Sequence, residues 1–304
     1  MGAYRRFLLG VALAAAAATQ AFGQTTLPAG VQNPAAAIPD FSGVWAHPFL
    51  TGYEPPASGP GPVLNTSRSR NGVANFQRLI GDYTNPILKP HAAERVQQHG
   101  DFSKVGGGYP TPSNQCWTGG VPYVFWDFLM QMFQEPDQIT MIYRHGNEVR
   151  HVYMNQSHPA QVTPSWYGHS VGHYEGDTLV IDTVGVKQGP FAMVDMYGTP
   201  FTDKLRVVER YRLLDYNDAK DAIERNVKEN FRAGSGDFDA NHRGKVLQLH
   251  FTVEDEGVFN MPWTATITYF PATVPWLELI CAENRREADA DHDMKVPTAD
   301  KPDF

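Results

Sequence analysis

The sequence predicts a mostly β protein, an antiparallel up-and-down β-barrel of about eight strands with a few peripheral helices. Three observations lead to this prediction. Strand-like runs follow one another at regular spacing through the second half of the chain. Turn signals such as His145-Gly146-Asn147 separate neighbouring runs. Glycine (27 residues) and proline (23 residues) are slightly frequent, which favours many turns over long helices.

The strand candidates are runs of β-branched, aromatic and other apolar residues bounded by turn residues. A short strand, Asp40–Trp45, enters the fold before them. Closure of about eight strands leaves room for side chains or one small ligand. The candidates are Ile139–Arg144, Glu148–Met154, His169–His173, Thr178–Val184, Leu205–Leu213, Val246–Val253, Trp263–Phe270 and Trp276–Ala282.

A hairpin at Trp166–Gly185 lies at the centre of these runs, with a tight turn at Tyr174-Glu175-Gly176-Asp177. Gly176 supplies the positive φ that a three-residue hairpin loop with a G1 bulge requires. We therefore expect this hairpin to be the middle of an antiparallel meander.

Two segments have helical character, and one apolar run fits two structures. Asn85–Gln98 and the polar stretch Asp218–Phe231 are predicted as helices. Pro122–Phe133 is so densely apolar and aromatic that it fits either a short buried helix or a strand pair. In either form we expect it to plug or cap the core.

The N-terminus has the parts of a secretory signal peptide. Arg5-Arg6 form a basic region, Phe7–Ala18 an apolar one, and Ala21-Phe22-Gly23 a cleavage site. We therefore expect a periplasmic or secreted protein, without a membrane span because the apolar run is too short. The predicted organisation is a signal peptide at 1–23, a flexible segment at 24–40, one barrel domain at 41–285 with an insertion at 218–244 as a possible lid, and a disordered tail at 286–304.

The chain has two cysteines, Cys116 and Cys281. In an oxidising compartment an even pair favours a disulfide. One cysteine precedes the meander and the other lies in its last predicted strand, and these ends are neighbours in a closed barrel. Two buried free thiols are the alternative.

The formal net charge of −8 argues against a nucleic-acid partner, because phosphate binding requires a basic face. Acidic balance otherwise indicates only a soluble chain.

The stretch Trp166–Thr183 resembles an uncharacterised family of exported bacterial proteins with the pattern W-x-G-x-S-x-G-x-W-E-G-D-T-L-V-V-x-T. Tyr174 stands where that pattern has tryptophan. The resemblance covers about residues 112–285 and implies export and a lipocalin-like barrel, but no activity. Further matching pieces are Arg150, Tyr153, His158-Pro159, Leu205–Tyr211, Pro262-Trp263 and Glu278–Glu283.

Glu209 is the first candidate catalytic residue, because it points into an otherwise apolar wall. Alternation along one strand places a single face inward. A carboxylate there must be paired or protonated, since an isolated buried charge costs several kcal/mol. A raised pKa would suit a general acid or base, whereas an ion pair with an inward arginine such as Arg150 is the structural alternative. The inward residues are Leu205, Val207, Glu209, Tyr211 and Leu213.

Histidines are the other catalytic candidates. His169 and His173 share one strand face and could supply a general base with a helper. His158 is a further candidate from a neighbouring segment. They could also be two metal ligands, but a metal would need a third ligand and no HExxH-type spacing is present, so we predict no metal site. The catalytic hypothesis requires no organic cofactor.

The residues Gly168-His169-Ser170-Val171-Gly172 match the G-x-S-x-G nucleophile pattern. That pattern has mechanical meaning only where a strand turns sharply into a helix. A hairpin and another strand follow here, so we do not predict a serine hydrolase.

The expected ligand-binding residues are Arg150, Tyr211, Trp263 and Tyr269, of which the last two share one face of a strand. The leading hypothesis is a barrel that encloses a small, largely apolar or aromatic molecule and acts on it by proton transfer, as a lyase, hydratase or isomerase. The alternatives are a binding or carrier protein for such a molecule and a structural barrel whose interior is filled.

Overall fold

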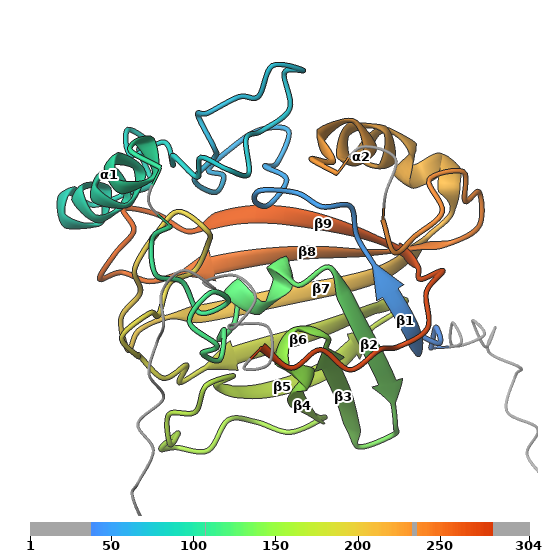
Figure 1. The fold of residues 1–304 in the computed structure, drawn as a ribbon. Coiled ribbons are helices and arrows are strands. Elements are labelled where there is room, and N and C mark those ends of the chain that lie inside the picture. The colour runs from blue at the N-terminus through green and yellow to red at the C-terminus, as the bar shows by residue number, and fades with distance from the viewer. Residues whose placement is uncertain (1–37, 107, 233–235, 282–304) are drawn as a thin grey trace, which may run out of the picture. The chain divides into compact units, whose positions relative to one another are not determined.

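The computed structural model describes residues 38–106, 108–232 and 236–281, and within them nine strands close into a barrel (Figure 1). The predicted signal peptide, most of the segment 24–40 and the tail 286–304 lie outside these residues. The mostly β barrel is thus confirmed, with nine strands in place of about eight. The strands are β1 (Gly43–Ala46), β2 (Leu129–Gln134), β3 (Gln138–Tyr143), β4 (Glu148–Met154), β5 (His169–Glu175), β6 (Thr178–Val184), β7 (Arg206–Leu214), β8 (Val246–Glu254) and β9 (Trp263–Pro271).

Strands that follow one another in the chain are neighbours in the barrel. Eight of the nine pairs are antiparallel, but β4 and β5 pair in parallel, with Val152 opposite Ser170. The purely up-and-down prediction is therefore wrong at this pair. Parallel neighbours require a crossover connection, and residues 155–168 supply it. Gly176 at the tip of the β5–β6 hairpin has φ 62°, as its turn requires.

The barrel closes at β1, which overlaps the short strand predicted at Asp40–Trp45. β1 pairs with β2 on one side and with β9 on the other, where Ala46 lies opposite Phe270. Because β1 occupies the edge beside β9, no edge remains there for the predicted strand Trp276–Ala282. Its described residues, 276–281, are not a strand, so that prediction is wrong. The run Pro122–Phe133 provides a 3₁₀ helix, η1 (Tyr123–Trp126), and then β2.

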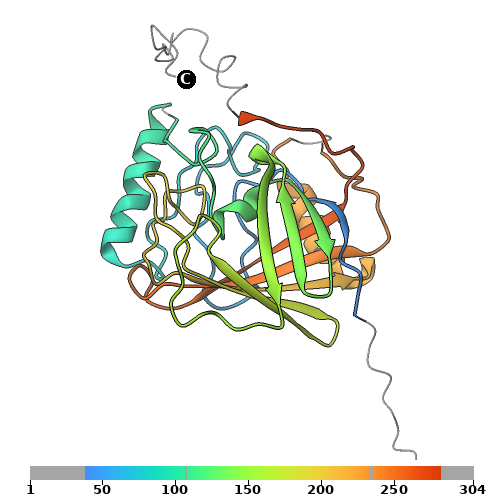
Figure 2. The ribbon, with the colours of Figure 1, turned by 90° about the horizontal axis from the view of Figure 1, so that it is seen from below.

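The interior face of β7 follows the predicted alternation. Val207, Glu209 and Tyr211 are fully buried, whereas Arg210 on the same strand is exposed. Large side chains from the other strands complete this core, which includes Phe251, Trp263 and Tyr269. In Figure 2, β2, β3 and β4 (green) run at a steep angle to β8 and β9 (orange). Large apolar and aromatic side chains fill most of the barrel interior.

Two α-helices of the described residues lie outside the barrel. α1 (Pro90–Lys104) begins later than the predicted helix, because Pro90 occupies the first helical position and the chain before it turns. α2 (Tyr216–Glu229) confirms the helix predicted in the insertion, and its Ala219 and Ile223 pack on Val246 and Phe270. In the described part of the chain, neither helix has the length and apolarity needed to cross a membrane.

Candidate functional site

Glu209 and Arg150 form an ion pair inside the barrel. Both side chains are fully buried, and two guanidinium nitrogens of Arg150 lie 2.6 and 2.9 Å from the carboxylate oxygens of Glu209. The Tyr211 hydroxyl donates to the same carboxylate at 3.1 Å. Such bidentate pairs are stable in a low-dielectric interior when their remaining hydrogen bonds are also made.

Ser170 and Thr183 complete this buried network. Arg150 Nη2 donates to Ser170 Oγ at 3.0 Å and to Thr183 Oγ1 at 2.8 Å. Ser170 is thus a hydrogen-bond partner of a buried ion pair. It lies near the start of β5, and the strand continues after it, whereas a nucleophile elbow requires a helix there. The arrangement has the geometry of the structural alternative for Glu209. Of the other expected ligand-binding residues, Tyr211, Trp263 and Tyr269 pack in the core.

The structure does not bring the candidate histidines to Glu209. Ser170 and Gly172 are the buried residues of β5, so His169 and His173 project from the outer face. His158 joins His169 there, with their Nδ1 atoms 2.9 Å apart, and its Nε2 lies 3.7 Å from Asp182 Oδ2. Burial and the neighbouring His158 lower the pKa of His169. Within the described residues, no group of three His, Cys, Asp or Glu side chains is placed to hold a metal ion.

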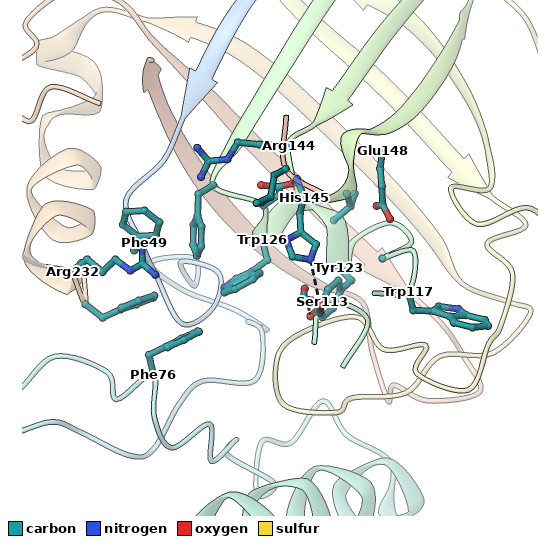
Figure 3. A pocket seen from close by; sticks show the side chains of 16 residues that line it. Phe49, Phe76, Ser113, Trp117, Tyr123, Trp126, Arg144, His145, Glu148 and Arg232 are labelled. Carbon is teal, nitrogen blue, oxygen red and sulfur yellow. Dashed lines mark hydrogen bonds between the residues drawn. The ribbon is translucent and has the colours of Figure 1, made fainter. Parts of the chain in front are cut away.

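A separate cavity of about 410 Å³ lies at one end of the barrel (Figure 3). Segments far apart in the sequence build its wall: the loop after β1, η1, the β3–β4 turn and the residues that follow α2. One half of the cavity is aromatic and the other carries carboxyl groups. The main lining side chains are Phe49, Phe76, Trp117, Tyr123, Trp126, Asp127, Phe128, Arg144, His145, Glu148, Phe231, Arg232 and Leu279.

Rings packed against each other form the aromatic half. Phe49 meets Phe128 edge-on, with centroids 4.3 Å apart, and Phe76 stacks on Phe231 at 4.4 Å. Trp126 meets Phe128 edge-on at 4.6 Å. Rings in such arrangements hold each other rigidly and present flat apolar surfaces to a ligand.

Glu148 is the chemically distinctive group of the other half. It is the first residue of β4, lines the cavity and accepts a hydrogen bond from the Tyr167 hydroxyl. Burial, and to a lesser extent the charge of Asp127, raise the pKa of Glu148 to about 7. A carboxyl group in this range exchanges protons readily near neutral pH.

Asp127 and His145 flank Glu148 and are fixed by hydrogen bonds. The backbone N–H of His145 donates to Asp127 Oδ2 at 2.6 Å, and burial raises the pKa of Asp127. His145 Nε2 lies 3.3 Å from the carbonyl oxygen of Ser113. When Nε2 carries the proton for that contact, Nδ1 remains available as an acceptor.

The C-terminal segment forms part of the cavity wall. Cys116 and Cys281 are joined by the predicted disulfide, with Cα atoms 5.4 Å apart. Leu279, two residues before Cys281, lines the cavity, and its carbonyl accepts a hydrogen bond from Gly146 N at 3.2 Å. The disulfide therefore fastens one wall of the cavity to another.

This site was missed from the sequence. Glu148 and His145 lie at a strand end and a hairpin turn, where no periodic pattern distinguishes them. Asp127 gave one usable signal, because it is the single charged residue of the run Pro122–Phe133. A lone carboxylate in an otherwise apolar run is more often functional or paired than solvated.

The raised pKa of Glu148 predicts a pH-dependent cost to stability. Its folded pKa of about 7 lies above the ordinary 4.5, so the folded state holds the proton more tightly. The stability from this group is complete below pH 4.5 and is lost as the pH rises to about 7. Glu148→Gln, with no charge to bury, should be more stable than the natural protein by ~1–3 kcal/mol at pH 8 and nearly equal at pH 4. Urea unfolding at the two pH values checks this, and an equal difference at both would contradict it.

Comparison with known proteins identifies no relative of this chain. No family model matches the chain, and neither the curated proteins nor the solved structures searched contain a match. The class that the fold and cavity define is a β-barrel protein with an aromatic, carboxyl-bearing pocket at its end.

Proposed function

We propose that the protein is exported and binds a small, largely apolar or aromatic molecule in the cavity at the end of the barrel, where it catalyses proton transfer without an organic cofactor. The reaction class is that of a lyase, hydratase or isomerase. One observation carries this function: an aromatic cavity of about 410 Å³ contains Glu148, a carboxyl group whose pKa is raised to about 7. The cavity has the size and the mixed lining of small-molecule sites.

Glu148 acts as the acid and base in this scheme. Near neutral pH both of its protonation states are populated, so it can accept a proton from a bound molecule and return it at another position. Tyr167 orients the carboxyl group through its hydrogen bond. The scheme gives a supporting role to His145, which also lines the cavity and whose Nε2 lies 3.3 Å from the Ser113 carbonyl oxygen.

The proposed acid and base is therefore Glu148 and not Glu209, the candidate from the sequence. Glu209 is fully buried and engaged with Arg150, and neither residue lines this cavity. Glu148 lines the cavity and keeps part of its surface accessible. A lipocalin-like use of the barrel, in which the interior holds the ligand, has less support because side chains fill that interior.

Native mass spectrometry of protein isolated from its own exported fraction identifies the retained molecule. Incubation of that molecule with the protein in D₂O then tests catalysis, because proton transfer replaces a C–H hydrogen with deuterium. We expect Glu148→Gln to slow this exchange by about 10²–10⁴-fold, while the affinity falls by no more than about tenfold.

Glu224→Gln is a matched control, because Glu224 lies exposed on α2 and outside the cavity lining. Its exchange rate should equal that of the natural protein. If the molecule binds but neither exchanges nor changes, the protein is a carrier, the alternative function. If no small molecule binds in the cavity, the function proposed here is wrong.

A further inference from the structure

The carboxyl half of the cavity contains a negative group without a cationic partner. Throughout the described ranges, no lysine, arginine or histidine side chain forms an ion pair with Glu148. It accepts a hydrogen bond from the Tyr167 hydroxyl, and hydrogen bonds from Thr118 and the Gly119 backbone also favour its ionised form. In lacking an ion pair within these ranges, it differs from Glu209, which Arg150 neutralises. A partly buried carboxylate in this state is stabilised by any cation that reaches it.

The charges around Glu148 do not compensate it. Asp127 adds a second negative charge, which raises the pKa of Glu148 further. The guanidinium of Arg144 lies 2.8 Å from Asp237 and is balanced there. Tyr167 and Asp127 act directly on Glu148, and Tyr143 lies opposite it on β3. The other charged or titratable groups of the cavity lining are Tyr123, Arg144, His145 and Arg232.

Aromatic rings next to this carboxyl group also favour a cation. Trp117 lines the cavity on the same side as Glu148, as Figure 3 shows. Ring faces attract ammonium and guanidinium groups, most strongly when water is excluded. The protein uses this contact nearby, with the Arg232 guanidinium 4.6 Å from the centre of the Phe49 ring.

Building on the function proposed above, we propose that the ligand is an aryl-alkyl amine, a small molecule with an aromatic ring and a protonated nitrogen. The ring packs among Phe49, Trp126 and Phe231, and the ammonium group lies beside Glu148 and Trp117. A carboxylate ligand would bring a third negative charge to Glu148 and Asp127. A neutral alcohol could still hydrogen-bond to the carboxylate, but it would bring no positive charge to offset the negative one.

The pH dependence of binding follows from the contact between the ligand's ammonium group and the carboxylate of Glu148. An ammonium group favours the ionised form of Glu148, so binding lowers the pKa of that carboxyl group. In the ligand-free protein the pKa of Glu148 is about 7. At a pH below this value, binding of the amine therefore releases a proton from Glu148. Affinity for the amine should rise from pH 6 to pH 8, whereas affinity for a neutral analogue should stay nearly constant.

Three probes of similar size separate the ligand classes: 2-phenylethylamine, 2-phenylethanol and 3-phenylpropionate. Calorimetric titration of the whole protein at pH 6 and pH 8 measures their affinities. At pH 8 we expect the amine to bind about tenfold more tightly than the alcohol, as one charge-assisted contact provides. At pH 6 the difference in affinity between the amine and the alcohol should be smaller. The binding enthalpy of the amine should then depend on the ionisation enthalpy of the buffer, because the buffer takes up the released proton.

Glu148→Gln should remove the preference for the amine while the alcohol binds as before, with Glu224→Gln as the unaffected control. The pH profile of the natural protein tests the same point should the variant fold poorly. If the alcohol or the carboxylate binds as tightly as the amine at pH 8, the amine assignment is wrong and the aromatic site stands. If none of the three binds, both the assignment and the proposed function are overturned.

Discussion

Replacing Arg150 with methionine is expected to lower the free energy of unfolding by ~3–5 kcal/mol, because it leaves the carboxylate of Glu209 buried without its cation. The remaining donors are the Tyr211 hydroxyl at 3.1 Å and the Thr183 hydroxyl at 3.4 Å. Neither carries a charge, and the Glu209 side chain is fully buried. Urea unfolding followed by circular dichroism at neutral pH measures the loss.

A double-mutant cycle separates the pair from its surroundings. Arg150→Met combined with Glu209→Gln should recover much of the loss, because it removes both buried charges together. Arg210→Met is the matched control: Arg210 pairs with Glu175 at 2.7 Å on the same strand β7 but in an exposed position. Its cost should stay within about 1 kcal/mol. If Arg150→Met costs no more than this control, Glu209 is solvated or protonated in the folded protein.

This ion pair is also the part of the interior that the sequence predicted best. Alternation along β7 indicated that Glu209 points inward, and burial then required a partner for its charge. Arg150 was the inward arginine available for that role. A two-residue period and the cost of an unpaired charge indicated that Glu209 is buried, but they left a catalytic role and an ion pair with Arg150 as alternatives.

Barrel closure was not predictable in the same way. β1 has four residues, too few for an alternation pattern, and it takes the edge beside β9. The run at 276–281 is as apolar as a strand, so sequence alone gave no reason to reject it. Strand pairing between distant segments is decided by competition for edges, which local patterns do not contain.

The cavity could not be predicted from the sequence for a related reason. Its lining comes from segments spread between Phe49 and Leu279, and several of them contribute only one or two side chains. Glu148 has a raised pKa because it is largely buried, and nothing in its neighbours along the chain indicates that burial. A site of this kind becomes visible only when the loops at the barrel end are placed together.

The second large effect is expected from the disulfide. Cys116→Ser combined with Cys281→Ser opens a loop whose ends are 165 residues apart, and the chain-entropy model gives a loss of up to ~5 kcal/mol. At the entropy of unfolding typical of a large domain, this lowers the melting temperature by up to about 10–20 °C. Thermal unfolding of the variant, and of the natural protein with and without reductant, measures the change.

The same change should weaken ligand binding, because the disulfide holds Leu279 in the cavity wall. Without it, the hydrogen bond from Gly146 N to the Leu279 carbonyl is too weak to keep the segment in place. Affinity for an aromatic probe should therefore fall further than in Val105→Ser, a surface control on a residue 83% exposed. If the reduced protein melts lower but binds equally well, the segment is held by other contacts and the disulfide stabilises the fold alone. Unchanged melting and unchanged affinity together would mean that the linkage between Cys116 and Cys281 contributes to neither.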